Sequence, residues 1–205
     1  MRTETRRNSL VKDFPWLRWS VFLLIAATSL AWDLWTKWAV FDWLGTDAQG
    51  ADHLWLGGLV RFRFRTTFNF GALWGMGQQM TWLFATLSVV AAVAILWWVF
   101  AKRAALGWWL TVCLGLILGG TLGNLFDRLG LHGWSRLGLP VRAVRDFLDF
   151  QFRGPWGEFD WAIFNFADTY LVAGAIMLVI YSFWAETAAS PANPLPEQGT
   201  VANHS

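Results

Sequence analysis

The sequence has 205 residues, of which 56% are hydrophobic and 15% are charged, and it contains 17 tryptophans. Soluble domains average roughly 25% charged and 45–50% apolar residues, so this composition favours a membrane protein and excludes a largely disordered chain. Because Cys113 is the only cysteine, a disulfide scaffold is excluded as well. The formal net charge of +2, without a basic stripe, argues against a nucleic-acid partner.

Four segments are long and apolar enough to span a membrane as helices, which requires about 20 residues each. They run roughly over Leu17–Val40, Met80–Ala101, Ala104–Phe126 and Trp161–Ala185. Basic residues precede the first segment and favour a cytoplasmic N-terminus, with the first span acting as an uncleaved signal anchor. The link between the third and fourth segments is also rich in arginine, so the orientation depends on the first helix and on the Lys102–Arg103 turn. An even number of spans then places the C-terminus in the cytoplasm too.

Two segments outside the spans have patterns of their own. Residues 59–69 alternate between apolar and arginine side chains, which predicts a strand with one solvated face. Residues 141–153 carry apolar side chains at helix-like spacing, which predicts a short amphipathic helix at the membrane interface. Residues 1–184 are expected to form a single domain, followed by a disordered tail over 185–205.

Ionisable and amide side chains occur at three places where membrane depth makes them costly, by about 2.5–3.5 kcal/mol for a charge at the centre of a helix, and such residues usually mark a functional site. Asp33 and Lys37 lie near the end of the first span, Asn124 and Asp127 near the end of the third, and Asp168 near the start of the fourth. With the N-terminus inside, all three places lie near the outer leaflet. The sequence therefore predicts one polar cluster at that depth.

Helical spacing indicates which groups face one another. Asn124, Asp127 and Arg128 are three and four residues apart and share one helix face, as do Asn165 and Asp168. A glycine every fourth residue over 115–123 allows a neighbouring helix to approach closely. The two aspartates could then share one proton, with one carboxyl activating water while the other protonates a leaving amine.

Simpler interpretations exist for each of these residues. Asp127 and Arg128 could form an ordinary interfacial ion pair, and Asp33 could simply neutralise Lys37. Asp146 and Asp149 would lie on the solvated face of the predicted interfacial helix. Neither a zinc-type cluster nor a plausible serine nucleophile with its base occurs at membrane depth, so neither a metal nor a cofactor is expected. Two other functions remain open: a proton-coupled carrier that uses the same carboxyls, and a membrane scaffold held by the glycine stripe.

Five motifs occur in the order found in one known family, and together they resemble lipoprotein signal peptidase, also called signal peptidase II. They are Asp33-Leu-Trp-Thr-Lys37, Asn69-Phe-Gly-Ala72, Gly119-Gly-Thr-Leu-Gly-Asn-Leu-Phe-Asp-Arg128, Asp146-Phe147 and Phe164-Asn-Phe-Ala-Asp168. The resemblance implies an all-α integral membrane fold of four helices, with a small extracytoplasmic β-cradle around 59–69 and a mobile periplasmic helix over 141–153.

The resemblance also implies an aspartic endopeptidase with Asp127 and Asp168 as its catalytic dyad. Supporting positions are Asp33, Lys37, Asn69, Gly71, Asn124, Arg128, Asp146 and Asn165. The family's substrates are diacylglyceryl-modified prolipoproteins, cleaved before the lipidated cysteine, and the cyclic peptide globomycin inhibits it. The implied setting is the bacterial inner membrane, with lipids as neighbours and the protein as a monomer.

Three features depart from the family pattern. The segment from Arg128 to Asp146 is longer than usual, Arg145 stands where a small apolar residue is typical, and Trp74 replaces a phenylalanine. These differences concern the surroundings of the predicted site and leave the dyad unchanged.

Overall fold

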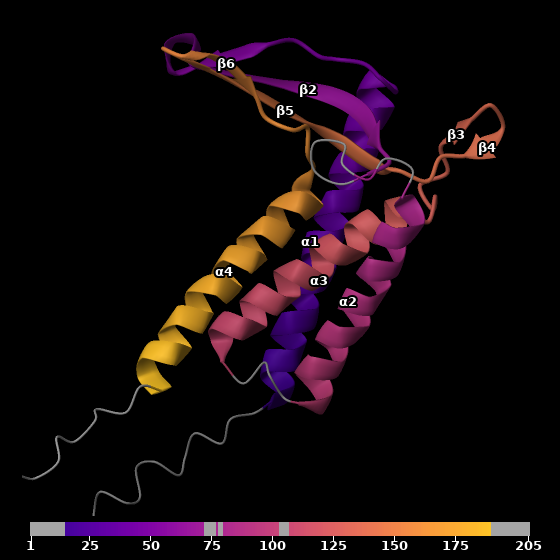
Figure 1. Cartoon of the computed structure of the whole chain (residues 1–205). Coiled ribbons are helices and arrows are strands. Elements are labelled where there is room, and N and C mark those ends of the chain that lie inside the picture. Colours follow the sequence, from indigo (N-terminus) through magenta and orange to yellow (C-terminus); the bar gives the residue numbers. More distant parts are fainter. Residues whose placement is uncertain (1–14, 72–76, 78–79, 103–106, 190–205) are drawn as a thin grey trace, which may run out of the picture.

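A computed structural model describes residues 15–71, 77, 80–102 and 107–189. Within them, four helices stand side by side and a small antiparallel sheet covers one end of the bundle (Figure 1). The helices are α1 (Pro15–Leu44), α2 (Thr81–Ala101), α3 (Trp108–Arg128) and α4 (Phe166–Ala189). All four have the length and apolar composition needed to cross a membrane, which confirms the four predicted spans.

The helix boundaries differ from the predicted ones mainly at α1 and α4. Helix α1 continues to Leu44, and α4 begins at Phe166 rather than near Trp161 and ends at Ala189, past the predicted start of the tail. Helix α1 begins and α4 ends at the end of the bundle opposite the sheet (Figure 1). The basic residues before position 15, Trp74 and residues 190–205 lie outside the described part of the chain.

The sheet has the strand order β1-β2-β5-β6, so its two central strands are far apart in the sequence. The strands are β1 (His53–Trp55), β2 (Val60–Asn69), β5 (Val144–Gly154) and β6 (Gly157–Asp160), with a short 3₁₀ turn, η1 (Leu56–Gly58), between β1 and β2. A separate hairpin consists of β3 (Ser135–Arg136) and β4 (Leu139–Pro140). The strand predicted over 59–69 is confirmed as β2.

The interfacial helix predicted over 141–153 is wrong, because most of this segment is strand β5, which pairs with β2 along nearly its whole length. Helix-like spacing of the apolar residues concealed a period of two over Leu148–Arg153, where apolar and polar side chains alternate. A short segment can satisfy either pattern, and a partner strand about 80 residues away decided between them.

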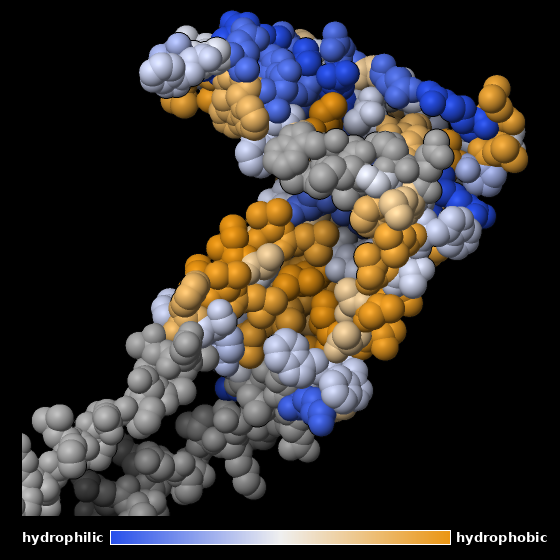
Figure 2. All heavy atoms as spheres, viewed as in Figure 1, coloured by the Kyte–Doolittle hydropathy of each residue, from blue (hydrophilic) through white to orange (hydrophobic). Residues whose placement is uncertain are grey.

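The two faces of the sheet differ in character. Phe62 lies against Phe150, with ring centroids 4.9 Å apart, on the face that turns toward the helices. On the other face, the Arg63 guanidinium pairs with Asp149 at 2.8 Å. Figure 2 shows the hydrophobic surface of the bundle below the hydrophilic outer side of the sheet. The amphipathic sheet therefore covers one end of the helix bundle, and its apolar face is turned toward the helices.

Glycines on α3 bring two neighbouring helices into close contact. A Cβ atom at Gly119 would lie 2.7 Å from Ser29 Cβ and 2.8 Å from the Ala26 carbonyl oxygen of α1. At Gly120 it would lie 2.5 Å from the Ala167 carbonyl oxygen of α4. The predicted packing role of the glycines is confirmed, and it draws α1 and α4 against α3 at the level of the polar cluster.

Gly119→Ala should lower stability by about 1–3 kcal/mol, because the added methyl has no room between the α1 and α3 backbones. The measurement is the thermal unfolding midpoint of the purified protein in detergent. Gly154→Ala is the matched control, since a Cβ atom there meets nothing within 4 Å. Equal midpoints for the two variants would contradict the close approach of the helices.

Candidate functional site

The predicted site residues come from all parts of the fold and meet between the ends of the helices and the sheet. Two come from α1, two from the end of β2 and the residues after it, three from α3, one from β5, and two from the start of α4. In that order they are Asp33 and Lys37; Asn69 and Gly71; Asn124, Asp127 and Arg128; Asp146; and Asn165 and Asp168. Direct contacts join the three polar places of the helices, as a shared depth requires.

Lys37 is the centre of the buried part of this cluster, and its side chain is fully inaccessible to solvent. Its ammonium lies 2.7 Å from Asp33 Oδ2 and 3.1 Å from Asp127 Oδ2, and it donates a hydrogen bond of 3.0 Å to Asn124 Oδ1. Asp33 in turn accepts a bond from the Ala167 amide at the start of α4. The lysine therefore uses all three of its N–H donors, one within α1 and two that join α1 to α3.

Asp127 is held by two cations. The pairing with Asp168 that was expected from the sequence is not observed. Its Oδ1 accepts bonds from Nε and Nη2 of Arg145 at 3.0 and 2.8 Å, and its Oδ2 accepts one from the Arg145 backbone amide. Lys37 lies against the same Oδ2 atom. A carboxylate with this many charge-assisted partners stays ionised, so the geometry argues against Asp127 as one half of a proton-sharing pair.

Asn165 and Asp168 form a reciprocal cap at the start of α4. The backbone amide of Asp168 donates to Asn165 Oδ1 at 3.1 Å, and the backbone amide of Asn165 donates to Asp168 Oδ2 at 3.2 Å. This arrangement is a capping box, with Asn165 as the N-cap and Asp168 three residues later, and it explains why the helix begins at Phe166. The cap also fixes the Asp168 carboxyl, whose Oδ1 accepts a 2.8 Å bond from Asn124 Nδ2.

Asp146 is the carboxyl group that is joined to Asp168 through Asn165. Its Oδ1 accepts a 2.6 Å bond from Asn165 Nδ2, and its Oδ2 accepts a 3.0 Å bond from Asn69 Nδ2. The solvated position expected for Asp146 is wrong, because the residue is only 1% exposed. Burial, together with the nearby charge of Asp168, raises the pKa of the Asp146 carboxyl well above its usual value.

The pairing of β2 with β5 is irregular next to Asp146. Phe64 pairs with Leu148 and Thr67 with Asp146, so two residues of β2 lie opposite one residue of β5. On the other side, the amides of Phe147 and Leu148 both donate to the Phe164 carbonyl just before α4. A bulge of this kind re-aims nearby side chains, and here it occurs where Asp146 meets Asn165.

Arg128 adds a positive charge beside the carboxyl groups. Its guanidinium lies 5.5 Å from the centroid of the Phe84 ring, and its charge faces Asp168, Asp146 and Asp127. Among the described residues, no group of three or more His, Cys, Asp or Glu side chains is arranged to hold a metal ion.

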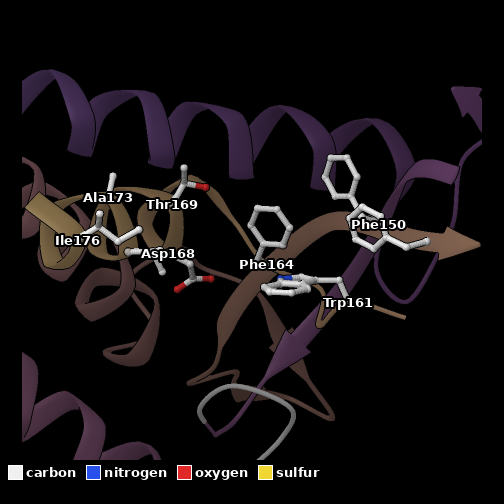
Figure 3. Close-up of a pocket in the computed structure, with 9 residues that line it drawn as sticks. Phe150, Trp161, Phe164, Asp168, Thr169, Ala173 and Ile176 are labelled. Atoms are coloured by element: carbon white, nitrogen blue, oxygen red, sulfur yellow. The ribbon is translucent and has the colours of Figure 1, made fainter. Parts of the chain in front are cut away.

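An apolar pocket of about 540 Å³ opens beside Asp168. Figure 3 shows Asp168 on one wall with Ala173 and Ile176 of α4, opposite Phe150, Trp161 and Phe164. In the space-filling view a hollow separates the sheet from α4 (Figure 2). Asp168 is therefore only half-buried, and it is the carboxyl group of the cluster that reaches an open apolar surface.

Sequence reasoning missed the aromatic wall of this pocket and the contact made by Arg145. The alternation of Leu148, Phe150 and Phe152 was the available signal for the wall, since it marks one face of a strand. Arg145 was recognised as a departure from the family pattern, but its partner Asp127 is 18 residues away and no local spacing relates the two.

The fold and the site together define a multi-pass membrane protein in which a buried carboxyl group, Asp146, and a half-buried one, Asp168, are joined through Asn165 under a small antiparallel sheet. A family model described as signal peptidase (SPase) II matches residues 25–184, and the chain belongs to this family. A lipoprotein signal peptidase of Rhodopirellula baltica is 42% identical over 173 residues, which are 83% of this chain and 74% of that protein. One of Mycobacterium avium is 34% identical over 189 residues, 90% of each chain.

Two solved structures share the fold, and both are described as bacterial membrane enzymes. One has a TM-score of 0.64 and 23% sequence identity, covering 84% of this chain and 93% of that one. The other has a TM-score of 0.59 and 24% identity, covering 80% and 92%. At this level of identity the likeness establishes the fold.

Proposed function

We propose that this protein is an aspartic endopeptidase that removes signal peptides from prolipoproteins, with Asp146 and Asp168 as its catalytic pair. The observation that carries this proposal is the pair itself: two carboxyl groups joined through Asn165, of which one is buried and the other faces an apolar pocket. Family membership supports the reaction and the substrate class. Asp127, which the sequence assigned to the pair, is here a supporting residue.

The two carboxyl groups divide the chemistry of hydrolysis. The pair holds one proton, which lies on Asp146 at rest because burial and the Asp168 charge favour the neutral acid there. Asp168 takes a proton from water, whose oxygen bonds to the scissile carbonyl carbon. Asp146 then protonates the amide nitrogen as the carbon–nitrogen bond breaks, which leaves a carboxylate on one product and an amine on the other. The pair titrates as a unit.

The remaining site residues hold this pair in place. Asn165 donates to Asp146 and caps the helix that carries Asp168, while Asn124 donates to Asp168 and accepts from Lys37. Asn69 fixes the other oxygen of Asp146 and accepts a bond from the Gly71 amide. Arg128 adds a positive charge beside the pair, which favours the oxyanion of a tetrahedral intermediate.

The apolar pocket favours a lipid-modified substrate. It lies against α4 and opens beside Asp168, so acyl chains can enter from the membrane while the peptide reaches the pair. This supports cleavage immediately before a cysteine that carries diacylglycerol. We further propose a monomer in the bacterial inner membrane, with both termini cytoplasmic and the sheet outside, which agrees with α1 beginning and α4 ending opposite the sheet (Figure 1).

The direct test is cleavage of a diacylglyceryl-modified prolipoprotein by the purified protein in detergent, followed by product mass. The expected products are the free signal peptide and the lipoprotein with an N-terminal lipidated cysteine. Absence of products from several such substrates would refute the proposal. Proton-coupled uptake without a change in substrate mass would favour the carrier instead, and partner binding that survives Asp168→Asn without any cleavage would favour the scaffold.

Ala173→Phe should raise KM for the lipidated substrate by about tenfold with little change in kcat. Ala173 lines the pocket, and a phenyl ring there displaces apolar contact equivalent to about two methylenes, each worth about 0.8 kcal/mol. Val179→Phe is the matched control, because Val179 is an exposed residue of α4 that does not line the pocket. An unchanged KM in Ala173→Phe would show that the pocket does not contribute to substrate binding.

A further inference from the structure

Arg145 is a buried cation whose side chain and backbone bind the same carboxylate. The residue is 3% exposed, and three of its N–H groups donate to Asp127 over 2.8–3.0 Å. Its guanidinium also lies 6.0 Å from the centroid of the Phe41 ring. Arg145 touches neither Asp146 nor Asp168 in these contacts, yet it immediately precedes Asp146 on β5.

We propose that Arg145 is a positioning residue, which holds Asp146 in place and balances the charge beside the catalytic pair by binding Asp127. This inference rests on the proposed function. It gives Asp127 a role as an anchor for β5 and gives the unusual Arg145 a role in the reaction.

The positioning follows from the geometry of the strand. Asp127 lies at the end of α3 and accepts from the Arg145 amide, so it ties the backbone of β5 to the helix one residue before Asp146. Successive side chains of a strand point to opposite faces. When Arg145 turns toward Asp127, Asp146 turns toward Asn69 and Asn165, which hold its two oxygens.

The balance follows from counting the charges that are buried together. Asp33 and Asp127 carry two negative charges, and Lys37 and Arg145 carry two positive ones. Lys37 cannot compensate for a missing Arg145, because its three donors are already used by Asp33, Asp127 and Asn124. Without Arg145 the group has a net charge of –1, and without the Asp127 charge it has a net charge of +1.

A net charge on this group acts on the catalytic pair. Asp168 is close enough for its charge to act on Lys37, and Asp146 follows Arg145 directly. The other ionisable groups whose charges interact with this group include Arg128 on α3, His132 after it and Tyr170 on α4, and all three are retained in the variants below. A unit charge roughly 10 Å away at an effective dielectric constant of about 20 shifts a titration by about one pH unit.

The test is the pH profile of signal-peptide release for wild type, Arg145→Met, Asp127→Asn and the double variant. Arg145→Met removes a positive charge and leaves the buried group with a net charge of –1. The catalytic pair then keeps its proton to higher pH, so the pH optimum should rise by about one unit. Asp127→Asn should lower the optimum by a similar amount. The double variant should return the optimum to the wild-type position and should cleave faster than either single variant. Arg145→Lys keeps the charge, so its optimum should stay in place while its rate falls.

The control for a general effect of losing an arginine is Arg63→Met, which breaks the pair with Asp149 on the outer face of the same sheet. Its optimum should not move. Single variants whose optima shift in the same direction, or stay at the wild-type value, would overturn the inference. So would a double variant slower than both singles, because a purely structural role predicts additive losses.

A second measurement separates this inference from the proposed function. Thermal unfolding midpoints of the same four proteins form a double-mutant cycle that requires no cleavage. We expect the double variant to lose less stability than the sum of the two single losses. Additive losses would refute the pairing even in an active enzyme. A wild type that cleaves no prolipoprotein but shows this coupling would refute the proposed function alone.

Discussion

Asp146→Asn and Asp168→Asn should each slow signal-peptide release by about 10²–10⁴-fold, the usual contribution of a positioned general acid or base. Asparagine has nearly the shape of the carboxyl group, and it can still accept the bonds that Asn165 and Asn124 donate to these positions. It cannot exchange a proton, so the reaction loses one half of the pair. The measurement is kcat for a lipidated prolipoprotein, with unfolding midpoints to establish that both variants fold.

Asp149→Asn is the matched control for these variants, because Asp149 is a buried aspartate of the same strand that pairs with Arg63 on the far face of the sheet. It should retain most of its activity. Asp127→Asn should retain measurable cleavage with a displaced pH optimum, since its loss disturbs position and charge without removing a proton carrier. If Asp146→Asn is fully active while Asp127→Asn is inactive at every pH, then Asp127 and not Asp146 is the partner of Asp168 in catalysis.

The stability of the Asp146→Asn variant provides an independent check of the raised pKa at this position. Because the folded pKa of Asp146 lies above the ordinary value of 3.8, the folded state binds the proton more tightly than the unfolded chain. Stability of the wild type therefore falls as pH rises from about 4 toward the folded pKa, by up to about 1.4 kcal/mol per unit. Asparagine does not ionise, so the stability of the variant should not fall over this pH range as that of the wild type does.

Lys37→Met should destabilise the protein by about 3–5 kcal/mol, because it removes the only cation paired with the fully buried Asp33 in the described structure. Asp127 would keep Arg145, so Asp33 is the carboxylate left without compensation. Adding Asp33→Asn should recover much of the loss, since the amide oxygen can still accept from the Ala167 amide. The unfolding midpoint in detergent measures both effects.

The control for losing a lysine is Lys102→Met, at the exposed end of α2, where the ammonium lies 5.2 Å from the centroid of the Trp97 ring. It should change the midpoint little. If Lys37→Met unfolds at the wild-type temperature, or if Asp33→Asn adds a further loss instead of a recovery, the buried ion pair does not support the fold in the way described.

Much of this fold could be predicted from the sequence because the relevant signals are local. Twenty or so apolar residues define a membrane span wherever they occur, and all four spans were found this way. Alternation over β2 and the glycine spacing on α3 are equally local, and both were interpreted correctly. The polar residues of the helices were found as well, because charged and amide groups at membrane depth are rare, whereas Asn69 and Asp146 were assigned to the site only through the family resemblance.

The structure of 141–153 and the partner of Asp168 depended on contacts between distant parts of the chain. Strand β5 forms because β2 offers a complementary edge, and within the segment the alternation over Leu148–Arg153 competes with helix-like spacing of the apolar residues. Asp127 and Asp146 look alike in sequence, each next to an arginine and near apolar residues. Only the folded chain brings Lys37 and Arg145 to the first and Asn69 and Asn165 to the second.

The sequence by itself determined that this is a four-span membrane protein with carboxyl groups gathered at one depth, since hydrophobicity and helical spacing act over a few turns. The tertiary structure decided which carboxyl groups are held by cations and which are held by amide side chains. That distinction depends on the charges and hydrogen-bond donors around each group, and these come from α1, α3, β2, β5 and α4 together. The electrostatic character of an aspartate is a property of its surroundings, and here the surroundings exist only once the chain has folded.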